Sequence, residues 1–203
     1  MSNNAASNDR LNTLIDGIFA IVLTLLVLDI KVPELASEAA LAEQLVDLWP
    51  QFFSYGLSFI ILGLFWLGHQ LASRCLCASD DIHIWLSLLF MMFIALVPFS
   101  SSLLGAYNNS RVAVVVYSSN IFAASLLRYV HWRYVSSHNR LIDKRLSAGL
   151  VAAVSRAFLS TPLLCLVAIA LSLVSTKLSL ILLTIALTNI LLRIGRLFRH
   201  RAI

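Results

Sequence analysis

Six long, nearly uncharged apolar stretches constrain this chain more than any other feature of its sequence. A helix needs about 20 mostly apolar residues to cross a hydrocarbon core of roughly 30 Å. The runs are continuous and do not alternate with a period of two, which disfavours a β-barrel. The sequence therefore predicts an all-α integral membrane protein, with six transmembrane helices in a single domain over residues 1–203. The predicted spans are approximately 11–31, 50–74, 83–105, 111–132, 150–174 and 178–197.

The composition supports this fold class. The 203 residues are 60% hydrophobic and 12% charged, whereas soluble domains carry about 45–50% apolar and roughly 25% charged residues. A water-soluble fold of this size cannot bury so much apolar surface, but a bilayer can cover it. The connections between the spans are also too short for a sizeable soluble domain.

Positive charges predict the orientation, because Lys and Arg concentrate in cytoplasmic loops. With the N-terminus inside, all but three of the 15 Lys and Arg residues fall on the cytoplasmic side or at adjoining helix ends; the exceptions are Lys31, Arg111 and Lys177. We therefore expect a multi-pass protein of the cell (inner or plasma) membrane, in contact with its lipids and with both termini in the cytoplasm.

The segment between the first two spans is acidic and too polar to cross a bilayer. Half of the 10 acidic residues lie between Asp29 and Asp47, on the predicted outer side. A solvated loop is the simpler interpretation, and an external vestibule that concentrates cations is the functional alternative. The leucine spacing within residues 33–49 also predicts a short amphipathic helix.

Asp16 is the most informative residue of the first span. It lies one or two turns inside the apolar run, where an ionisable group without a partner costs about 2.5–3.5 kcal/mol at mid-membrane and therefore marks a functional hypothesis. A charge favoured by the helix macrodipole near the N-terminus is the simpler alternative. Further along this span four residues share one face, and from spacing alone they predict packing against a neighbouring helix. They are Ile21, Thr24, Leu25 and Leu28.

The second span carries Trp66 and His69 on one face, followed by Gln70. Polar side chains in an apolar span are expected to point into the bundle and to hydrogen-bond across helices. No second His or Cys stands at ligand spacing on this segment, so we predict no metal site.

Catalytic motifs are absent from the sequence. It contains no nucleophile elbow, no His-Glu-x-x-His pair and no P-loop, and the Thr-Val-Gly-Tyr-Gly filter of potassium channels is missing as well. The cysteines at 75, 77 and 165 form no metal or disulfide framework. We therefore expect neither an enzyme nor a bound cofactor.

The first span nevertheless resembles the opening helix of the transmembrane protein 175 family of potassium channels, whose signature is Arg-x-x-x-Phe-Ser-Asp. Arg10 and Asp16 match this signature and are followed by Ile-Phe-Ala-Ile-x-x-Thr-Leu-Leu-Val-Leu. Leu14 and Ile15 stand where the family has Phe and Ser. The Trp-x-x-His pair of the second span, after Tyr-Gly-Leu-Ser-Phe at 55–59, is similar to the second helix of the family.

The resemblance implies a potassium-permeable homotetramer, with a central pore lined at the subunit interface by the first helix of each copy. In this family, layers of apolar residues on that helix replace the usual filter, assisted by a threonine layer. Potassium is then the permeant ion, and nucleic acid is not a partner. Carried over by position, the pore-lining constriction comprises Ile21, Thr24, Leu25 and Leu28. Residues expected to form a structural network behind the pore wall are Arg10, Asp16, Trp66 and His69.

Two other functions compete with the channel. A secondary transporter would place ionisable groups near mid-membrane and break helices in matching halves, and only Asp16, Pro98 and Pro162 offer support for it. A membrane enzyme acting on lipid would need an interfacial cluster. Asp80, Asp81 and His83 are its only candidates, and their simpler interpretation is a cytoplasmic turn.

Overall fold

The structure is a computed structural model that describes residues 2–31, 45–137, 140–143 and 146–185. Every long element in these ranges is a helix. The named helices are α1 (Ser2–Leu28), α3 (Trp49–Ser73), α4 (Asp81–Ala95), α5 (Val97–Ala106), α6 (Arg111–Ser136) and α7 (Ala148–Ser172). A further short apolar helix covers Thr176–Ile185.

Five helical stretches are long and apolar enough to cross a membrane: Asp9–Leu28, Trp49–Ser73, Asp81–Ala106, Arg111–Ser136 and Ala148–Ser172. Each overlaps one predicted span, so the prediction of an all-α membrane protein is confirmed. For the predicted sixth span, 178–197, only the first part is within the described residues, where the helix Thr176–Ile185 begins it. Most of the predicted amphipathic helix at 33–49 lies outside the described residues.

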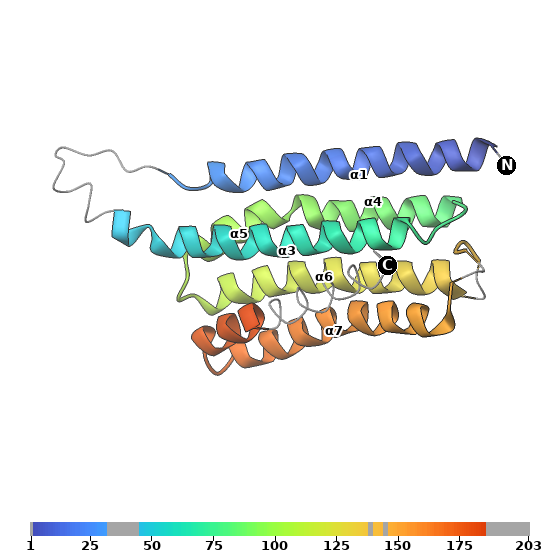
Figure 1. Cartoon of the computed structure of the whole chain (residues 1–203). Coiled ribbons are helices and arrows are strands. Elements are labelled where there is room, and N and C mark those ends of the chain that lie inside the picture. The colour runs from blue at the N-terminus through green and yellow to red at the C-terminus, as the bar shows by residue number, and fades with distance from the viewer. Residues whose placement is uncertain (1, 32–44, 138–139, 144–145, 186–203) are drawn as a thin grey trace, which may run out of the picture.

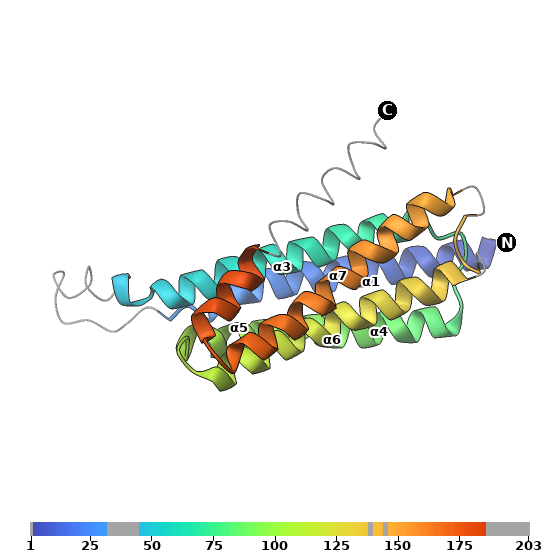
Figure 2. The same cartoon turned by 90° about the horizontal axis from the view of Figure 1, so that it is seen from below.

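The helices run side by side along one long axis (Figure 1 and Figure 2). The start of α1, the turn between α3 and α4, and the junction of α6 with α7 lie at the same end (Figure 1), called here the N-terminal end. Helix α1 lies at one edge of the bundle and packs against α3, α4 and α5, while α6 packs extensively with α7 on the other side. One face of α1 therefore has no covering helix among the elements described.

The packed face of α1 follows helical periodicity. Its buried side chains recur every three or four residues, which places them along one stripe. Phe19 meets Phe90 of α4 with ring centroids 6.4 Å apart, and Phe65 of α3 lies 5.7 Å from the same ring. The buried residues of this stripe are Leu11, Ile15, Phe19, Val22 and Leu26.

Prolines lie in three of the helices, at two kinds of position. Pro50 and Pro98 lie in the first turns of α3 and α5, where the missing N–H leaves no helical hydrogen bond unmade. Pro98 therefore coincides with a break between two helices, since α4 ends at Ala95 and α5 begins at Val97. Pro162, by contrast, lies inside α7, and the helix continues through it.

A chain of hydroxyl groups ties α3 to α5 and α6. The hydroxyl oxygens of Ser58 and Tyr117 are 2.9 Å apart, Ser58 Oγ donates to Ser101 Oγ at 2.8 Å, and Ser101 Oγ donates to the carbonyl oxygen of Ser54 at 3.1 Å. The helices are close enough there that a Cβ on Gly105 would lie 2.6 Å from Ser54 Oγ. These bonds fix α5 against α3, and both helices support α1.

Candidate functional site

The uncovered face of α1 carries the four residues predicted to line a pore. Ile21, Leu25 and Leu28 are 60%, 43% and 71% exposed in the single chain, and Thr24 is exposed between them. They point away from the stripe that packs on α3, α4 and α5. Large apolar side chains on an uncovered helix face indicate contact with lipid, with another chain or with a narrow conduit.

The Thr24 hydroxyl on this face is hydrogen-bonded within its own helix. Its Oγ1 lies 2.8 Å from the carbonyl oxygen of Ile21 and 3.2 Å from that of Ala20, and it donates its hydrogen within its own helix. The lone pairs of the oxygen are left available to an outside group. A threonine held in this way can offer oxygen ligands to a cation.

Arg10 lies on the same uncovered face as the predicted constriction, two turns or more towards the N-terminus. It lines a shallow groove together with Leu14, Gly17 and Ile21, residues that recur every three or four positions. No described side chain forms a hydrogen bond or ion pair with Arg10. The structure therefore does not bring Arg10 together with Asp16, which lies on the flank of α1 that faces α3.

Asp16 and Trp66 do meet. The indole Nε1 of Trp66 donates to Asp16 Oδ1 at 2.9 Å, and Gln70 Nε2 donates to the same oxygen at 3.0 Å. The carboxylate thus receives two neutral donors from consecutive turns of α3. These two bonds fix the rotation of α1 relative to α3 near the N-terminal end.

His69 belongs to a second, neighbouring cluster. Its Nε2 lies 3.2 Å from Asn12 Oδ1 and 3.1 Å from Ser73 Oγ, and Ser73 Oγ also donates to Asn12 Oδ1 at 3.1 Å. Neither Asn12 nor Ser73 was predicted from the sequence to be part of this network. A usable signal existed, because Asn12 precedes Asp16 by four residues and Ser73 follows His69 by four, so each pair shares a helix face.

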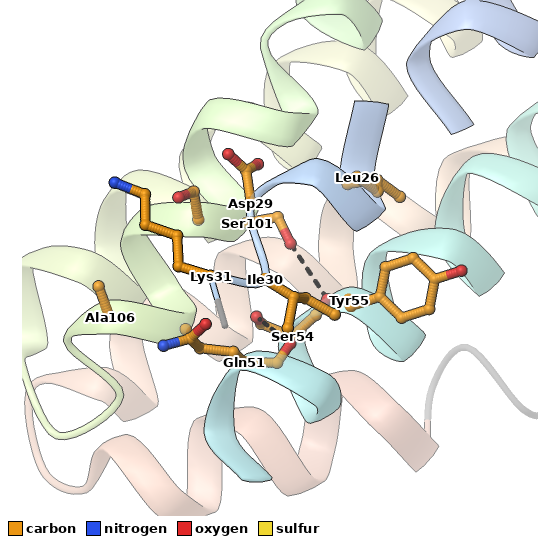
Figure 3. A pocket seen from close by; sticks show the side chains of 11 residues that line it. Leu26, Asp29, Ile30, Lys31, Gln51, Ser54, Tyr55, Ser101 and Ala106 are labelled. Atoms are coloured by element: carbon orange, nitrogen blue, oxygen red, sulfur yellow. Dashed lines mark hydrogen bonds between the residues drawn. The ribbon is translucent and has the colours of Figure 1, made fainter. Parts of the chain in front are cut away.

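A pocket of about 160 Å³ lies at the opposite end of α1. Figure 3 shows its wall, built from Asp29 and Lys31 after α1, Gln51 and Ser54 of α3, and the segment of α5 around Ser101. Asp29 is the only acidic side chain that lines it among the described residues. The pocket therefore mixes one positive charge, one negative charge and several neutral oxygens.

Asp80, at the N-terminal end, is used for structure. It caps α4 by accepting from the backbone N–H of His83 at 2.9 Å, accepts from Tyr134 Oη at 2.6 Å, and pairs with Arg140 Nε at 3.4 Å. Burial raises the pKa of Asp80, but the bonds from Tyr134 and His83 and the charge of Arg140 outweigh it, so the pKa lies below its usual value. Asp81 is exposed beside it.

These contacts give structural partners to the residues that the alternative, a lipid-acting enzyme, would use. Asp80 is committed to a cap and an ion pair, and His83 Nδ1 bonds to His131 Nε2 at 2.6 Å. No group of three or more His, Cys, Asp or Glu residues that could hold a metal occurs in the described part of the chain.

Fold and site together define a multi-pass helical membrane protein whose first helix is fixed by polar contacts on one side and left uncovered on the other. The family model described as endosomal/lysosomal potassium channel TMEM175 matches residues 10–98. A potassium channel of Chamaesiphon minutus is 31% identical over 84% of this chain and 86% of its own length. One from Streptomyces collinus is 34% identical over 68% of this chain and 69% of its own.

The solved structures agree with these relatives. The crystal structure of a lysosomal potassium-selective channel TMEM175 homolog from Chamaesiphon minutus superimposes with a TM-score of 0.84 and 28% identity, covering 93% of this chain and 98% of that one. The chain belongs to the TMEM175 family. The resemblance in its first two helices is thereby confirmed, and membership of a channel family also confirms that it is not an enzyme.

Proposed function

We propose that this chain is a potassium-permeable channel of the cell membrane, built from four copies around a central pore lined by α1. The observation that carries the proposal is the uncovered face of α1, whose exposed residues lie opposite the packed stripe. Its relatives in Chamaesiphon and Streptomyces are named potassium channels. A cyclic tetramer is a closed symmetry that brings one α1 per subunit to the axis.

The apolar side chains give this pore a constriction. Four copies of Ile21, with Leu25 and Leu28 beyond, make rings of branched side chains that offer water no hydrogen bonds, so a narrow neck dewets and resists ion passage. The Thr24 layer offers hydroxyl oxygens between these rings. Potassium selection in the absence of a carbonyl filter is assigned to this combination of a narrow apolar neck and a hydroxyl layer.

The polar contacts behind α1 have a positioning role. The bonds from Trp66 and Gln70 to Asp16, and the cluster of Asn12, His69 and Ser73, hold α1 against α3 so that its other face meets the axis. Arg10 lies on the uncovered face at the cytoplasmic entrance, where it contacts a neighbouring copy. Both termini are cytoplasmic, which places the Asp29 pocket at the outer mouth.

The test compares two substitutions at matched depth. Asp16 bonds Trp66 across antiparallel helices, so Ile21 lies at about the level of Ile60, which is 50% exposed on α3. Ile21→Asn is expected to wet the neck and to raise potassium flux into liposomes while weakening the preference over sodium. Ile60→Asn is the control and leaves both unchanged. Unchanged flux per folded Ile21→Asn channel would overturn the pore assignment, and no potassium flux from the unaltered protein would overturn the channel.

A further inference from the structure

Arg128 is a buried cation away from the pore face. It lies in α6, two turns before the N-terminal end of the bundle, and is 6% exposed. Its guanidinium carbon is 4.7 Å from the ring centre of Phe158 on α7 and 5.5 Å from that of Phe90 on α4. On a third side it meets α3, where a Cβ on Gly68 would lie 3.3 Å from Nη2.

One nitrogen of this guanidinium has no acceptor. Nη2 is buried without a hydrogen-bond partner, and no carboxylate in the described ranges pairs with Arg128; Asp80 pairs with Arg140 instead. Arginine stays charged and carries five N–H donors. Aromatic rings attract its charge, but they do not supply the in-plane acceptors that a desolvated guanidinium requires.

The rest of the sequence offers no counter-charge at this place. Residues 138–139, 144–145 and 186–203 contain no Asp or Glu. The three glutamates in 32–44 stand in the sequence between α1 and α3, and the end of α1 and the start of α3 lie at the opposite end of the bundle (Figure 1). A buried charge left unpaired destabilises a protein strongly, so a partner from outside the chain is required.

A small cavity adjoins Arg128 and is lined by His69, His83 and His131 as well. No acidic side chain lines it among the residues described. The bond between His83 Nδ1 and His131 Nε2 uses one nitrogen of each ring, and Asn12 and Ser73 occupy Nε2 of His69. One nitrogen of each ring is left over. Because one ring of the His83–His131 pair donates and the other accepts, one of that pair's two remaining nitrogens carries a hydrogen, and the wall combines one fixed positive charge with one further donor.

The size of the cavity limits its occupant. The centre of a water molecule can move over about 20 Å³ within it, so the cavity favours a small anion over a bulky one. We infer that the cavity beside Arg128 binds a single halide ion, chloride in the cell, which neutralises the guanidinium and accepts hydrogen bonds from it and from one imidazole of the His83–His131 pair.

Bromide serves as the probe, because it resembles chloride and scatters anomalously. Crystals of the full-length protein grown in potassium bromide are expected to show an anomalous peak beside the Arg128 guanidinium. In detergent at constant potassium, replacing gluconate by bromide should raise Tm with the logarithm of bromide concentration, by about 3–6 °C once bromide is tenfold above its Kd. Arg128→Met should abolish this dependence on bromide, and Arg133→Met, an exposed arginine on the same helix, should retain it.

Each possible result either supports or overturns the halide site beside Arg128. A peak together with a bromide-dependent Tm that Arg128→Met removes supports the halide site. A cavity without an anomalous peak, with a Tm equal in bromide and gluconate, shows that water occupies it and overturns the inference. Bromide dependence that survives in Arg128→Met also overturns it. If Arg128→Met does not fold, the anomalous map of the unaltered protein gives the answer alone.

Discussion

Asp16 accepts two hydrogen bonds from α3 and has no cationic partner among the described residues. Its replacement should therefore lower the stability of the fold through the loss of these two bonds. Asp16→Ala leaves Trp66 Nε1 and Gln70 Nε2 without their acceptor. Hydrogen bonds to charged groups are worth about 1.5–3 kcal/mol in water, and bonds between membrane helices about 0.6 kcal/mol. We expect a loss of about 1–3 kcal/mol in stability, measured by thermal unfolding in detergent. Asp16→Asn, which keeps an acceptor oxygen, should recover most of it.

The same pair of variants separates positioning from ion contact. If Asp16 only holds α1, both variants that assemble retain the potassium-to-sodium flux ratio of the unaltered channel. A stable, fully assembled Asp16→Asn channel with a changed ratio would show that the carboxylate faces the ions.

Thr24 gives a second test at this scale. Its hydrogen is donated within α1, so Thr24→Val removes the oxygen lone pairs from the uncovered face with little change in volume. We expect the potassium-to-sodium ratio in liposome flux to fall. The free energy of unfolding should change by less than about 1 kcal/mol, because no contact to another helix is lost. Thr24→Ser keeps the hydroxyl and should keep the ratio. Equal ratios in all three proteins would remove Thr24 from the selectivity mechanism.

Sequence reasoning reached part of the polar network and missed the rest for a physical reason. Asp16 and Trp66 stand out because an ionisable group and an indole are conspicuous in apolar spans. Asn12 and Ser73 lie in the polar ends of their helices, where such residues are ordinary. Arg128 was counted only as one of many cytoplasmic positive charges, since its burial depends on three other helices whose packing no local pattern specifies.

Among the elements, α4 depends on Asp80 at its start. Asp80→Ala removes the N-cap and the bonds to Tyr134 and Arg140, and loss of an N-cap alone costs about 0.5–2 kcal/mol. We expect a lower Tm at neutral pH with normal ion preference, since the contacts lie away from the pore face. Asp81→Ala, at the exposed neighbour, is the control and should have little effect. A change in selectivity with an unchanged Tm would contradict this structural role.

The depressed pKa of Asp80 also predicts a pH dependence. A carboxylate whose pKa is lower in the folded state stabilises the fold above its unfolded pKa, and the contribution disappears as pH falls through the folded pKa. With an unfolded pKa of about 3.9, the loss begins near pH 4 and continues below it. Tm measured from pH 7 down to pH 3 should fall less steeply in Asp80→Ala than in the unaltered protein. Parallel curves would show that Asp80 is not depressed.

Helix positions were predictable and their interruptions were not. The five spans up to residue 174 follow from apolar length alone, because a bilayer imposes a minimum run. Pro98 and Pro162 both lie within predicted spans, yet one separates α4 from α5 and the other lies within α7. The outcome depends on whether neighbouring helices support the backbone groups that proline frees, which the sequence of one helix does not encode.

For the whole molecule, the topology can be tested without any ion measurement. The excess of Lys and Arg on one side predicts that a reporter inserted near Glu38 and one at the C-terminus lie on opposite sides of the membrane. Paired alkaline phosphatase and green fluorescent protein fusions at each site report the two compartments. Identical labelling at both positions would overturn the arrangement with both termini inside.

Assembly is the last property to follow from the uncovered face of α1, and cysteine chemistry can test it. The native thiols Cys75 and Cys165 are buried and Cys77 is exposed. The Cys77→Ser variant therefore removes the exposed native thiol that could crosslink on oxidation. Leu28→Cys on a four-fold axis brings equivalent thiols of neighbouring subunits together, and disulfides form where Cα atoms come within about 7 Å. Oxidation in membranes should then give covalent dimers, as adjacent pairs link around the ring. Ile60→Cys, on another exposed face, should remain monomeric on the same gel.

Native mass spectrometry of the unaltered protein should show a tetramer. Leu28→Cys that stays monomeric in a proven tetramer would place α1 away from the axis, whereas a protein that is only monomeric or dimeric would remove the axis itself.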